Sequence, residues 1–269
     1  MRRLVLAAFV AVAPLAAACA ETQSAPPANP LKYAEDAKKA YDRAVEAFLE
    51  KDWEEARVLF GEVKRKYAYS KWAREAELRL ADIDFEQEKF TSAITGYRSF
   101  AHDHRTDEGV PYARFRICKA LFAQVSDTIL LPPQEERDQG AIVDAYRELN
   151  SFLLDHPESR WSRDAKYMLL SVTGRLVRHE LYVARYYLGA GRFEPAMKRV
   201  QYALATYDGS GLEPEAMLLL AETYLKMKKI PESKQVLAQL FATYPGSPFV
   251  DAARRLEAEI EQRHSAVPR

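Results

Sequence analysis

Two histidines flank an aspartate at residues 102–104, and imidazole and carboxylate groups are ligands that many transition metals accept. His104, however, falls at a position that recurs along the chain as a tyrosine or a histidine, so the repeat described below already accounts for it. No His-Glu-x-x-His or Cys-x-x-Cys motif is present. The sequence therefore predicts no metal site and no other bound cofactor.

Carboxylates and thiols give an equally weak signal for catalysis. Asp82 and Glu86 lie four residues apart and would share one face of a helix. Paired carboxylates can work as general acid and base, but no histidine lies near this pair, so a solvated helix face is the favoured interpretation. Cys118 is a single thiol in a helical pattern, and such a residue is most often a small buried hydrophobe. We predict no catalytic residue and no enzymatic activity.

Two glycine-containing stretches lack the spacing that their chemistry would need. Gly189-Ala190-Gly191 has no third glycine and follows a helical pattern, unlike a dinucleotide-binding loop. Gly209-Ser210-Gly211 does not match the Gly-x-Ser-x-Gly turn that presents a nucleophilic serine. The charge balance excludes another class, because 39 basic and 39 acidic residues give no support for binding to nucleic acid.

The elements that must position any functional side chain form an internal repeat. Five copies share an apolar residue after a turn, a small residue three positions later, and a tyrosine or histidine eleven positions after that. The apolar column is Trp53, Phe90, Ile142, Phe193 and Ile230; the small column is Ala56, Ala93, Ala145, Ala196 and Ser233; the aromatic column is Tyr67, His104, His156, Tyr207 and Tyr244. A second alanine column follows at Ala76, Ala113, Ala165, Ala216 and Ala253.

This pattern predicts tetratricopeptide (TPR) hairpins, in which small residues stand where helices cross. Alanine lets two helix backbones approach closely, and Pro157 and Pro245 would stop the second helix of their repeats. One hairpin cannot cover its own apolar face, so neighbouring hairpins must stack. We therefore predict an all-α fold, a TPR-like α-solenoid of about five helix–turn–helix repeats.

Two copies are longer than the others. Ala165 and Phe193 are 28 residues apart, whereas the equivalent residues of the second and fifth copies are 14 apart, so the first helix of the fourth repeat is predicted to be elongated. Gly174 lies inside it, and the sequence leaves open whether residues 161–192 form one helix or two. The third copy gains residues that include Pro132-Pro133, which predict a surface loop.

The N-terminus has the pattern of a secretory signal peptide, with Arg2 and Arg3 before an apolar run over residues 4–18. The run is too short to span a bilayer. It ends in Leu15-Ala16-Ala17-Ala18-Cys19, which resembles a bacterial lipobox with its leucine one place further out than usual. We expect acylation of Cys19 after cleavage, and Ala20 after it resembles an outer-membrane sorting signal. The alternative is a secreted protein with an unmodified cysteine.

These features divide the chain into four parts. Residues 1–18 are the expected lipoprotein signal peptide, and residues 19–31 the lipidated N-terminus with a flexible tether rich in proline, alanine and serine. Residues 32–262 hold the five repeats, and residues 263–269 form a C-terminal tail.

One helical stretch carries tyrosine and arginine beyond what the repeat requires. Tyr182, Arg185 and Tyr186 are spaced to share one helix face, with Arg199 following in the next predicted helix. Tyrosine and arginine are the residues that protein interfaces favour. Packing between helices, with a solvated arginine edge, is the alternative interpretation.

The same stretch carries a family resemblance. His179-Glu180-Leu181-Tyr182-Val183-Ala184-Arg185-Tyr186-Tyr187, followed by Gly191, Phe193, Ala196 and Arg199-Val200, closely resembles the BamD family of outer-membrane assembly lipoproteins, also called the ComL or YfiO type. Ala76–Ala81 and Glu136-Arg137-Asp138 also match, and the lipobox and five repeats agree. The chain departs from the family at Ala68 and Arg105, where prolines are common, which bears on where those helices end.

The resemblance implies a lipid-anchored scaffold on the periplasmic side of the outer membrane. Its C-terminal repeats would bind the POTRA domains of the insertase BamA, alongside the other BAM lipoproteins, and its N-terminal repeats would receive the targeting strands of unfolded outer-membrane proteins. Arg199 matches a family arginine on the insertase-facing side, and we assign Arg185, Tyr182 and Tyr186 to the same side. For the substrate groove, helix geometry alone indicates Tyr41, Phe48, Arg79 and Phe85 on a concave face lined by the first helices.

Three alternatives stand beside this interpretation. A pilotin of a pilus secretin would be another envelope TPR lipoprotein, but without the elongated fourth copy. A Tol-associated cell-envelope coordinator would carry an N-terminal coiled coil. An enzyme with a TPR appendage would need a second domain, and no region outside the repeats is large enough to form one.

Overall fold

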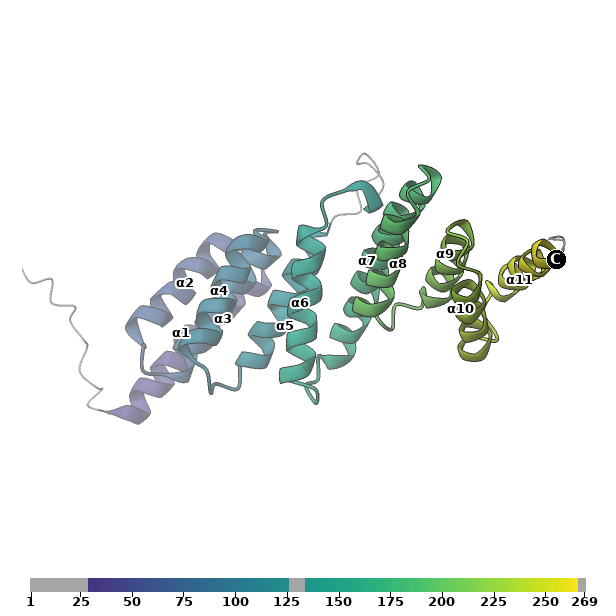
Figure 1. Cartoon of the computed structure of the whole chain (residues 1–269). Helices are drawn as coiled ribbons and strands as arrows, with labels where there is room; N and C mark the ends of the chain where they lie inside the picture. The colour runs from purple at the N-terminus through teal and green to yellow at the C-terminus, as the bar shows by residue number, and fades with distance from the viewer. Residues whose placement is uncertain (1–28, 126–133, 266–269) are drawn as a thin grey trace, which may run out of the picture.

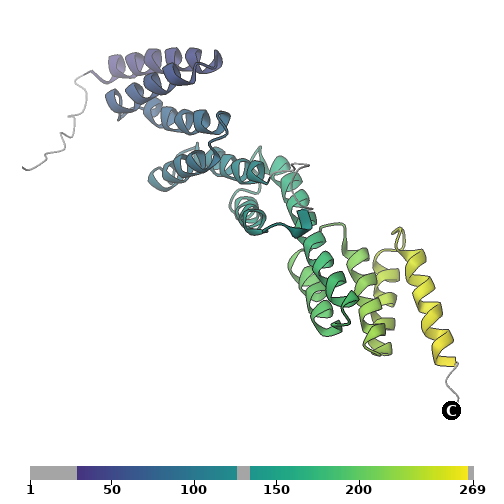
Figure 2. The ribbon, with the colours of Figure 1, turned by 90° about the horizontal axis from the view of Figure 1, so that it is seen from above.

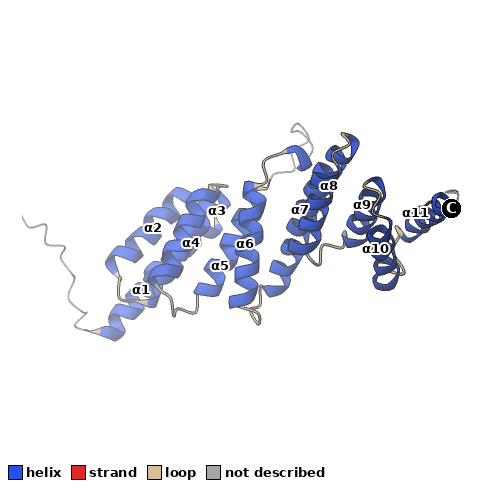
Figure 3. Ribbon diagram, viewed as in Figure 1, coloured by secondary structure: helices blue, strands red, loops and turns tan. Residues whose placement is uncertain are grey.

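The computed structural model describes residues 29–125 and 134–265, and these residues form eleven α-helices, one short 3₁₀ helix and no strand (Figure 3). The elements are α1 (Pro30–Leu49), α2 (Trp53–Lys66), α3 (Lys71–Glu86), α4 (Phe90–Asp103), α5 (Val110–Gln124), η1 (Gln134–Glu136), α6 (Gly140–Asp155), α7 (Ser162–Gly189), α8 (Phe193–Thr206), α9 (Glu213–Lys226), α10 (Ile230–Thr243) and α11 (Val250–Ser265). The predicted signal peptide, Cys19 and most of the predicted tether lie outside the described residues, as does Pro132-Pro133.

The described helices pair as five consecutive hairpins, α1–α2 to α9–α10, and α11 packs against the last of them. Figures 1 and 2 show these pairs following one another along the molecule, with α1 and α11 at opposite ends. The predicted apolar column supplies the first residue of α2, α4, α8 and α10. The predicted TPR-like α-solenoid with five repeats is confirmed.

The aromatic column marks the end of each second helix. Tyr67, His104, His156, Tyr207 and Tyr244 are the C-cap residues of α2, α4, α6, α8 and α10. Proline follows two of these caps, yet α2 and α4 end at the same place with Ala68 and Arg105 there instead. The backbone of the turn, rather than proline, therefore sets these helix ends.

Both ends of the repeat region reach slightly further than expected. Helix α1 begins at Pro30, inside the stretch assigned to the tether, because the Asn29 side chain accepts a hydrogen bond from the Lys32 amide at 3.2 Å and proline fits the first helical turn. Helix α11 extends to Ser265, three residues beyond the expected boundary at 262.

The elongated first helix of the fourth repeat is one continuous helix. Helix α7 runs for 28 residues from Ser162 to Gly189. Gly174 is buried within it and does not interrupt it, because glycine in a helix costs about 1 kcal/mol while tertiary packing along the whole helix outweighs that cost.

The turns between the two helices of a hairpin need one residue with positive φ. This residue is Lys51, Glu88, Gly191 and Lys228 in the first, second, fourth and fifth hairpins, with φ of 63°, 59°, 72° and 61°. Only glycine adopts this conformation without a steric cost, so three of these hairpins contain a mildly strained turn.

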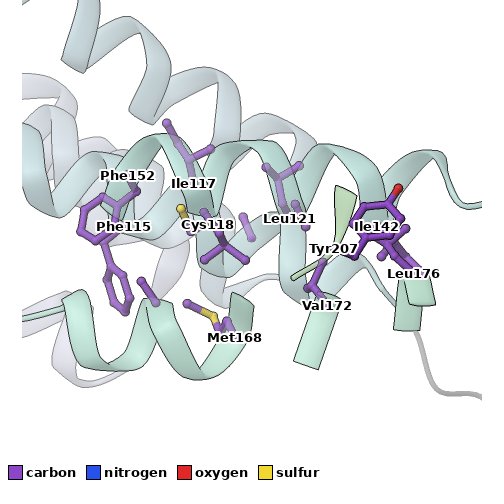
Figure 4. Close-up of a cluster of buried hydrophobic side chains, with 14 of the residues drawn as sticks. Phe115, Ile117, Cys118, Leu121, Ile142, Phe152, Met168, Val172, Leu176 and Tyr207 are labelled. Carbon is purple, nitrogen blue, oxygen red and sulfur yellow. The ribbon is translucent and has the colours of Figure 1, made fainter. Parts of the chain in front are cut away.

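The two predicted small columns lie where helices cross, and their residues are almost completely buried. Ser233 takes the place of alanine in the fifth copy, and its hydroxyl donates to the Ala221 carbonyl at 2.8 Å, which satisfies a buried polar group. Larger side chains fill the spaces between these crossings (Figure 4). Cys118 lies among them, as predicted, and burial raises the pKa of its thiol to about 12.

Neighbouring hairpins contact each other mainly through the second helix of one and the first helix of the next, as in α2 with α3 and α4 with α5, and successive first helices also meet. Helix α1 contacts α3, α5 contacts α7, and α7 contacts α9, whereas successive second helices make no comparable contacts in the described residues. The first helices therefore line the inner face of the solenoid. Within residues 29–125 and 134–265, every helix is too short or too polar to cross a bilayer.

Candidate functional site

The first candidate region is a polar network on the inner face between α3 and α5. Asp82 of α3 lies at its centre with 2% of its side chain exposed. Its carboxylate accepts hydrogen bonds from Arg79 on the same helix and from Tyr97 of α4. The Tyr112 hydroxyl of α5 lies 2.8 and 2.9 Å from the two carboxylate oxygens, and Arg116 Nε lies at 3.4 Å.

This burial corrects the expectation that Asp82 and Glu86 form a solvated helix face. Glu86 is exposed and pairs with Arg116 at 3.3 Å, but Asp82 is enclosed by side chains from three helices. Spacing on α3 alone could not reveal this, because the residues that cover Asp82 lie in α4 and α5. Two arginines and two tyrosines contact both carboxylate oxygens of Asp82, so neither oxygen is placed to exchange a proton with a substrate.

The network shifts the ionisation of its own members. Burial, followed by the negative charge of Asp82, raises the pKa of Tyr112 to about 12, and the same causes raise the pKa of Tyr97. Burial opposes the charged form of Arg79 and is the largest single cause, but the charges of Asp82 and its other neighbours together outweigh it and raise the pKa of that arginine. All of these shifts hold one arrangement of charges at neutral pH.

An open pocket of about 380 Å³ lies beside this network. Its lining comes from two successive first helices, α3 and α5, and from the turns before α5 and α7: Glu75, Leu78, Arg79, Glu108, Gly109, Tyr112, Arg160 and Trp161. Tyr112 packs against the Trp161 ring at 5.5 Å, and the Arg160 guanidinium lies 4.3 Å from that ring. Aromatic faces and both signs of charge are therefore available along one inner surface.

Three of the four residues predicted for a groove lie along this surface. Arg79 lines the pocket, and Tyr41 lies close enough to it that the arginine charge opposes the burial that raises the pKa of Tyr41. Phe85 lies under the Arg116 guanidinium, 3.9 Å from the ring centre. Phe48 instead packs between Trp53 and Phe60 inside the first hairpin.

The second candidate region is the contact between α7 and α8. Glu180 of α7 is buried, and its carboxylate accepts hydrogen bonds from Arg199 of α8 at 3.1 and 3.4 Å. Beside this pair lies an open pocket of about 510 Å³ lined by Tyr187, Glu194, Pro195, Lys198, Arg199 and Tyr202. Arg199 keeps 43% of its side chain exposed, so one face of its guanidinium remains available to a partner.

The other three predicted interface residues lie elsewhere on α7. Tyr182 donates to Glu136 of η1 at 2.7 Å, Arg185 pairs with Glu215 of α9, and Tyr186 is largely exposed. Tyr182 and Tyr187 are five residues apart, which is a rotation of roughly 140° around a helix. The four residues assigned to one interface are therefore on two sides of α7, with Arg199 on one and the tyrosines and Arg185 on the other.

The segment 134–136 connects two stretches that the sequence treats separately. His179 Nδ1 lies 2.7 Å from the Glu135 carbonyl, and Tyr182 contacts Glu136. The described end of the third-repeat insertion is therefore packed on α7. Two parts of the sequence that carry the family resemblance, one at η1 and one in α7, therefore contact each other in the structure.

Sequence reasoning missed several residues that build these regions. Tyr112 and Arg116 lie four residues apart on α5, a spacing that indicates a shared face but not what that face covers. Tyr187 and Tyr202 lie in different helices, so their spacing in the sequence gives no sign that they line one pocket. Within the described residues, no group of three or more histidine, cysteine or acidic side chains is arranged around a common point for a metal. His104 contacts Glu77 at 2.9 Å.

The sequence matches the family described as YfiO, outer membrane lipoprotein, over residues 33–240. It is 27% identical over 206 residues to a protein of Caulobacter vibrioides named outer membrane protein assembly factor BamD, covering 76% of this chain and 65% of that protein. A protein of the same name from Xylella fastidiosa is 26% identical over 189 residues, covering 68% of this chain and 64% of that one.

In both cases the chain spans slightly less than two thirds of the relative's length. Among solved structures, a thermophilic TPR protein of Thermus thermophilus is 17% identical with a TM-score of 0.34, covering 84% of this chain and 97% of that one. A score this low adds nothing to the helical architecture already described.

Proposed function

Because the chain belongs to the YfiO family of outer membrane lipoproteins, we propose that it is a scaffold of outer-membrane β-barrel assembly that binds partners without catalysing a reaction. In this proposal its partners are the POTRA domains of the insertase BamA, the other lipoproteins of the BAM complex, and unfolded outer-membrane proteins. The name shared by its relatives, outer membrane protein assembly factor, supports this role.

The proposal assigns a task to each part of the chain. Residues 1–18 direct export, and acylated Cys19 with the following tether holds the scaffold at the outer membrane, facing the periplasm. Several acyl chains give stable anchoring, because each buried methylene contributes about 0.8 kcal/mol. Anchoring also raises the local concentration of the scaffold near a membrane-bound insertase.

The observation that carries the proposal is the exposed arginine beside an open pocket at α7 and α8. Arg199 is held by the buried Glu180, so its orientation is fixed before a partner arrives. Tyr187 and Tyr202 supply aromatic surface in the same pocket, and Lys198 adds a second cation. At protein interfaces, aromatic and arginine side chains in a preformed pocket contribute most of the binding free energy. We assign this pocket to the insertase.

Tyr182, Arg185 and Tyr186 then form a second contact surface on the inner face. Arg185 is half exposed while it pairs with Glu215, and Tyr186 presents its ring to solvent. A partner with extended POTRA-type domains could touch both sides of α7, whereas a small partner would touch one. We therefore propose that the two surfaces bind different parts of the same complex.

For the unfolded client we propose the inner surface between α1 and α7. Tyr112, Trp161 and Arg160 offer aromatic faces and a cation to a partly apolar extended strand, and Arg79 and Tyr41 continue the same surface. The Asp82 network makes this surface rigid, so a client binds a preformed groove. The scaffold would pass the strand on by release, with no covalent step.

A pull-down from envelope extract tests the insertase assignment. Arg199→Glu would place two carboxylates together at Glu180, so a loss of binding could reflect misfolding. Lys198→Glu is the sharper variant, because Lys198 lines the same pocket and its ion-pair partner among the described residues is Glu194, which is exposed, at 3.1 Å. We expect this variant to recover several-fold less insertase than the parent, measured by mass spectrometry.

Lys39→Glu on α1 is the matched control, because it makes the same charge change at an exposed position far from α8. Circular dichroism confirms that each variant keeps its helices. Equal insertase recovery from the parent and from the Lys198→Glu variant would remove the pocket from the interface.

A further inference from the structure

The junction between α2 and α3 is the most basic turn of the solenoid. Residues 63–73 contain Lys64, Arg65, Lys66 and Lys71 and no aspartate or glutamate. Lys32 of α1 joins them in space, because the Tyr33 hydroxyl lies 3.5 Å from the Lys66 carbonyl and 3.4 Å from the Tyr69 amide. We call these five cations the basic patch. All five are exposed.

Few carboxylates neutralise this patch. Lys64 lies 3.4 Å from Glu77, while Lys32, Arg65, Lys66 and Lys71 make no ion pair with any residue of the described chain. Lys71 and Lys38 instead lie 4.7 and 5.6 Å from the Trp72 ring centre. Most of the positive charge therefore faces solvent, where it can attract a polyanionic surface.

The equivalent turns of the other hairpins lack this character. Over windows equivalent to residues 63–73, residues 100–110 at α4–α5 hold Asp103, Asp107 and Glu108 against one arginine, and residues 152–162 at α6–α7 hold Asp155 and Glu158 against Arg160. Residues 203–213 at α8–α9 hold two acids and no lysine or arginine, and residues 240–250 at α10–α11 hold no charged residue. The repeat architecture therefore does not require basic residues here. Their concentration belongs to the junction of the first and second hairpins alone.

The first hairpin is also where the chain reaches its proposed anchor. Asn29 caps α1 and lies ten residue steps after Cys19, a distance of at most about 35 Å when fully extended. Leu31 and Tyr69 lie at the same end with 80% and 57% of their surfaces exposed. Tyrosine and apolar side chains flanked by lysines are typical of surfaces that rest at a bilayer interface.

We propose that the basic patch binds the anionic phospholipid head groups of the membrane that holds the lipid anchor. The proposal rests on the acylation of Cys19 in the proposed function. An acyl anchor alone fixes the distance from the membrane but not the orientation. A second contact at the first hairpin points the long axis of the solenoid away from the bilayer, which leaves the surfaces on α7 and α8 accessible to partners. Each lysine or arginine at an anionic surface adds to this attraction.

The test places a fluorescent probe on the acylated protein bound to vesicles that contain a head-group quencher. Ala68→Cys puts the probe inside the patch, and Ala258→Cys puts it on an exposed position of α11 at the other end. Cys118 is buried and does not compete for the label. We expect quenching at position 68 with phosphatidylglycerol present at low salt, and little with phosphatidylcholine alone or at high salt. Position 258 should be unquenched throughout.

Charge reversal identifies the residues responsible. Lys66→Glu together with Lys71→Glu should reduce the population that touches the membrane by on the order of tenfold or more. Lys226→Glu with Lys229→Glu makes the same charge change at exposed positions near the α9–α10 turn and should have no effect. Circular dichroism checks that both double variants keep their helices.

The outcomes separate this proposal from the one it rests on. Flotation with pure phosphatidylcholine vesicles reports the anchor alone, so its failure would count against acylation. Salt-sensitive flotation with phosphatidylglycerol vesicles would still support the patch in that case. Equal quenching at position 68 with and without phosphatidylglycerol, or a charge-reversed variant that behaves like the parent, would overturn the proposal.

Discussion

Asp82 in α3 and Glu180 in α7 are both buried carboxylates on first helices, and both contact arginine, yet their surroundings differ. Asp82 is surrounded by two arginines and two tyrosines, and Arg116 and Arg79 keep only 12% and 26% of their side chains exposed. Glu180 hydrogen-bonds to one arginine, and 43% of that arginine is exposed. The Asp82 carboxylate links side chains of neighbouring hairpins, whereas the Glu180 carboxylate holds an arginine toward solvent.

A buried carboxylate paired with arginine therefore serves two different purposes in this molecule. A buried ion pair is weak evidence for stability, because desolvation offsets most of the attraction. When every partner is enclosed, as around Asp82, the network fixes the arrangement of neighbouring helices. When the cation stays half exposed, as at Arg199, the carboxylate orients a group that can still bind another molecule.

The largest expected effect comes from removing the two carboxylates in turn. Asp82→Ala leaves two poorly hydrated arginines without the buried carboxylate that they share, so we expect a loss of about 3–5 kcal/mol in the free energy of unfolding. Glu180→Ala leaves an arginine that water can reach, so we expect about 1–3 kcal/mol. Urea unfolding followed by circular dichroism measures both. Equal losses would remove the distinction between the two regions.

Two residues of the small column allow a comparison in which the second and the fourth repeat should lose similar stability. Ala93 of α4 and Ala196 of α8 are both fully buried at helix crossings. Replacing either with leucine should overpack the crossing and cost about 1–3 kcal/mol. Thermal melting of the two variants measures the effect. An unchanged Tm for Ala93→Leu would contradict the role given to this column.

Alkaline pH tests the Asp82 network from its tyrosines. The pKa of Tyr112 in the folded protein is raised to about 12, above the value near 10 of an unfolded chain. Between these values the folded state keeps a proton that the unfolded state loses. The contribution of Tyr112 to the free energy of unfolding is therefore fully present below pH 10 and falls as pH rises toward 12, by on the order of 1–2 kcal/mol.

Urea unfolding at several pH values across this range measures that slope. Tyr112→Phe removes one ionising hydroxyl and should make the slope shallower, while Tyr97 and Cys118, whose pKa values are also raised, keep part of it. The variant begins less stable because Asp82 loses a hydrogen bond. A parent and a variant with parallel slopes would show that Tyr112 does not couple to folding.

The smallest expected effect is a gain at the hairpin turns. Lys51 and Lys228 adopt positive φ, which glycine adopts without strain. Lys51→Gly in the first hairpin and Lys228→Gly in the fifth should each stabilise the protein by about 0.5–1 kcal/mol, because relief of strain exceeds the added chain entropy. Differential scanning calorimetry measures the gain. Gly191→Ala, in the fourth hairpin, is the reverse change, and a rise in Tm there would contradict this account.

The sequence by itself determined the hairpins. Buried alanines and apolar residues at helical spacing define which face of each helix meets its partner, and the aromatic column marks where the second helices end. These features are local, because a helix pairs with the next one along the chain. The elongated α7 could be predicted for the same reason, although only packing along its whole length decided that Gly174 does not divide it.

The tertiary structure alone decided which polar residues are covered. Asp82 reads as a solvated acid on its own helix, and becomes buried only because Tyr97 and Tyr112, 15 and 30 residues later, fold over it. Arg199 in α8 and Tyr182 in α7 are close in the sequence but lie on different surfaces, because Arg199 contacts Glu180 and Tyr182 contacts Glu136. Helical periodicity specifies a direction around one axis, whereas these outcomes depend on how successive hairpins are stacked.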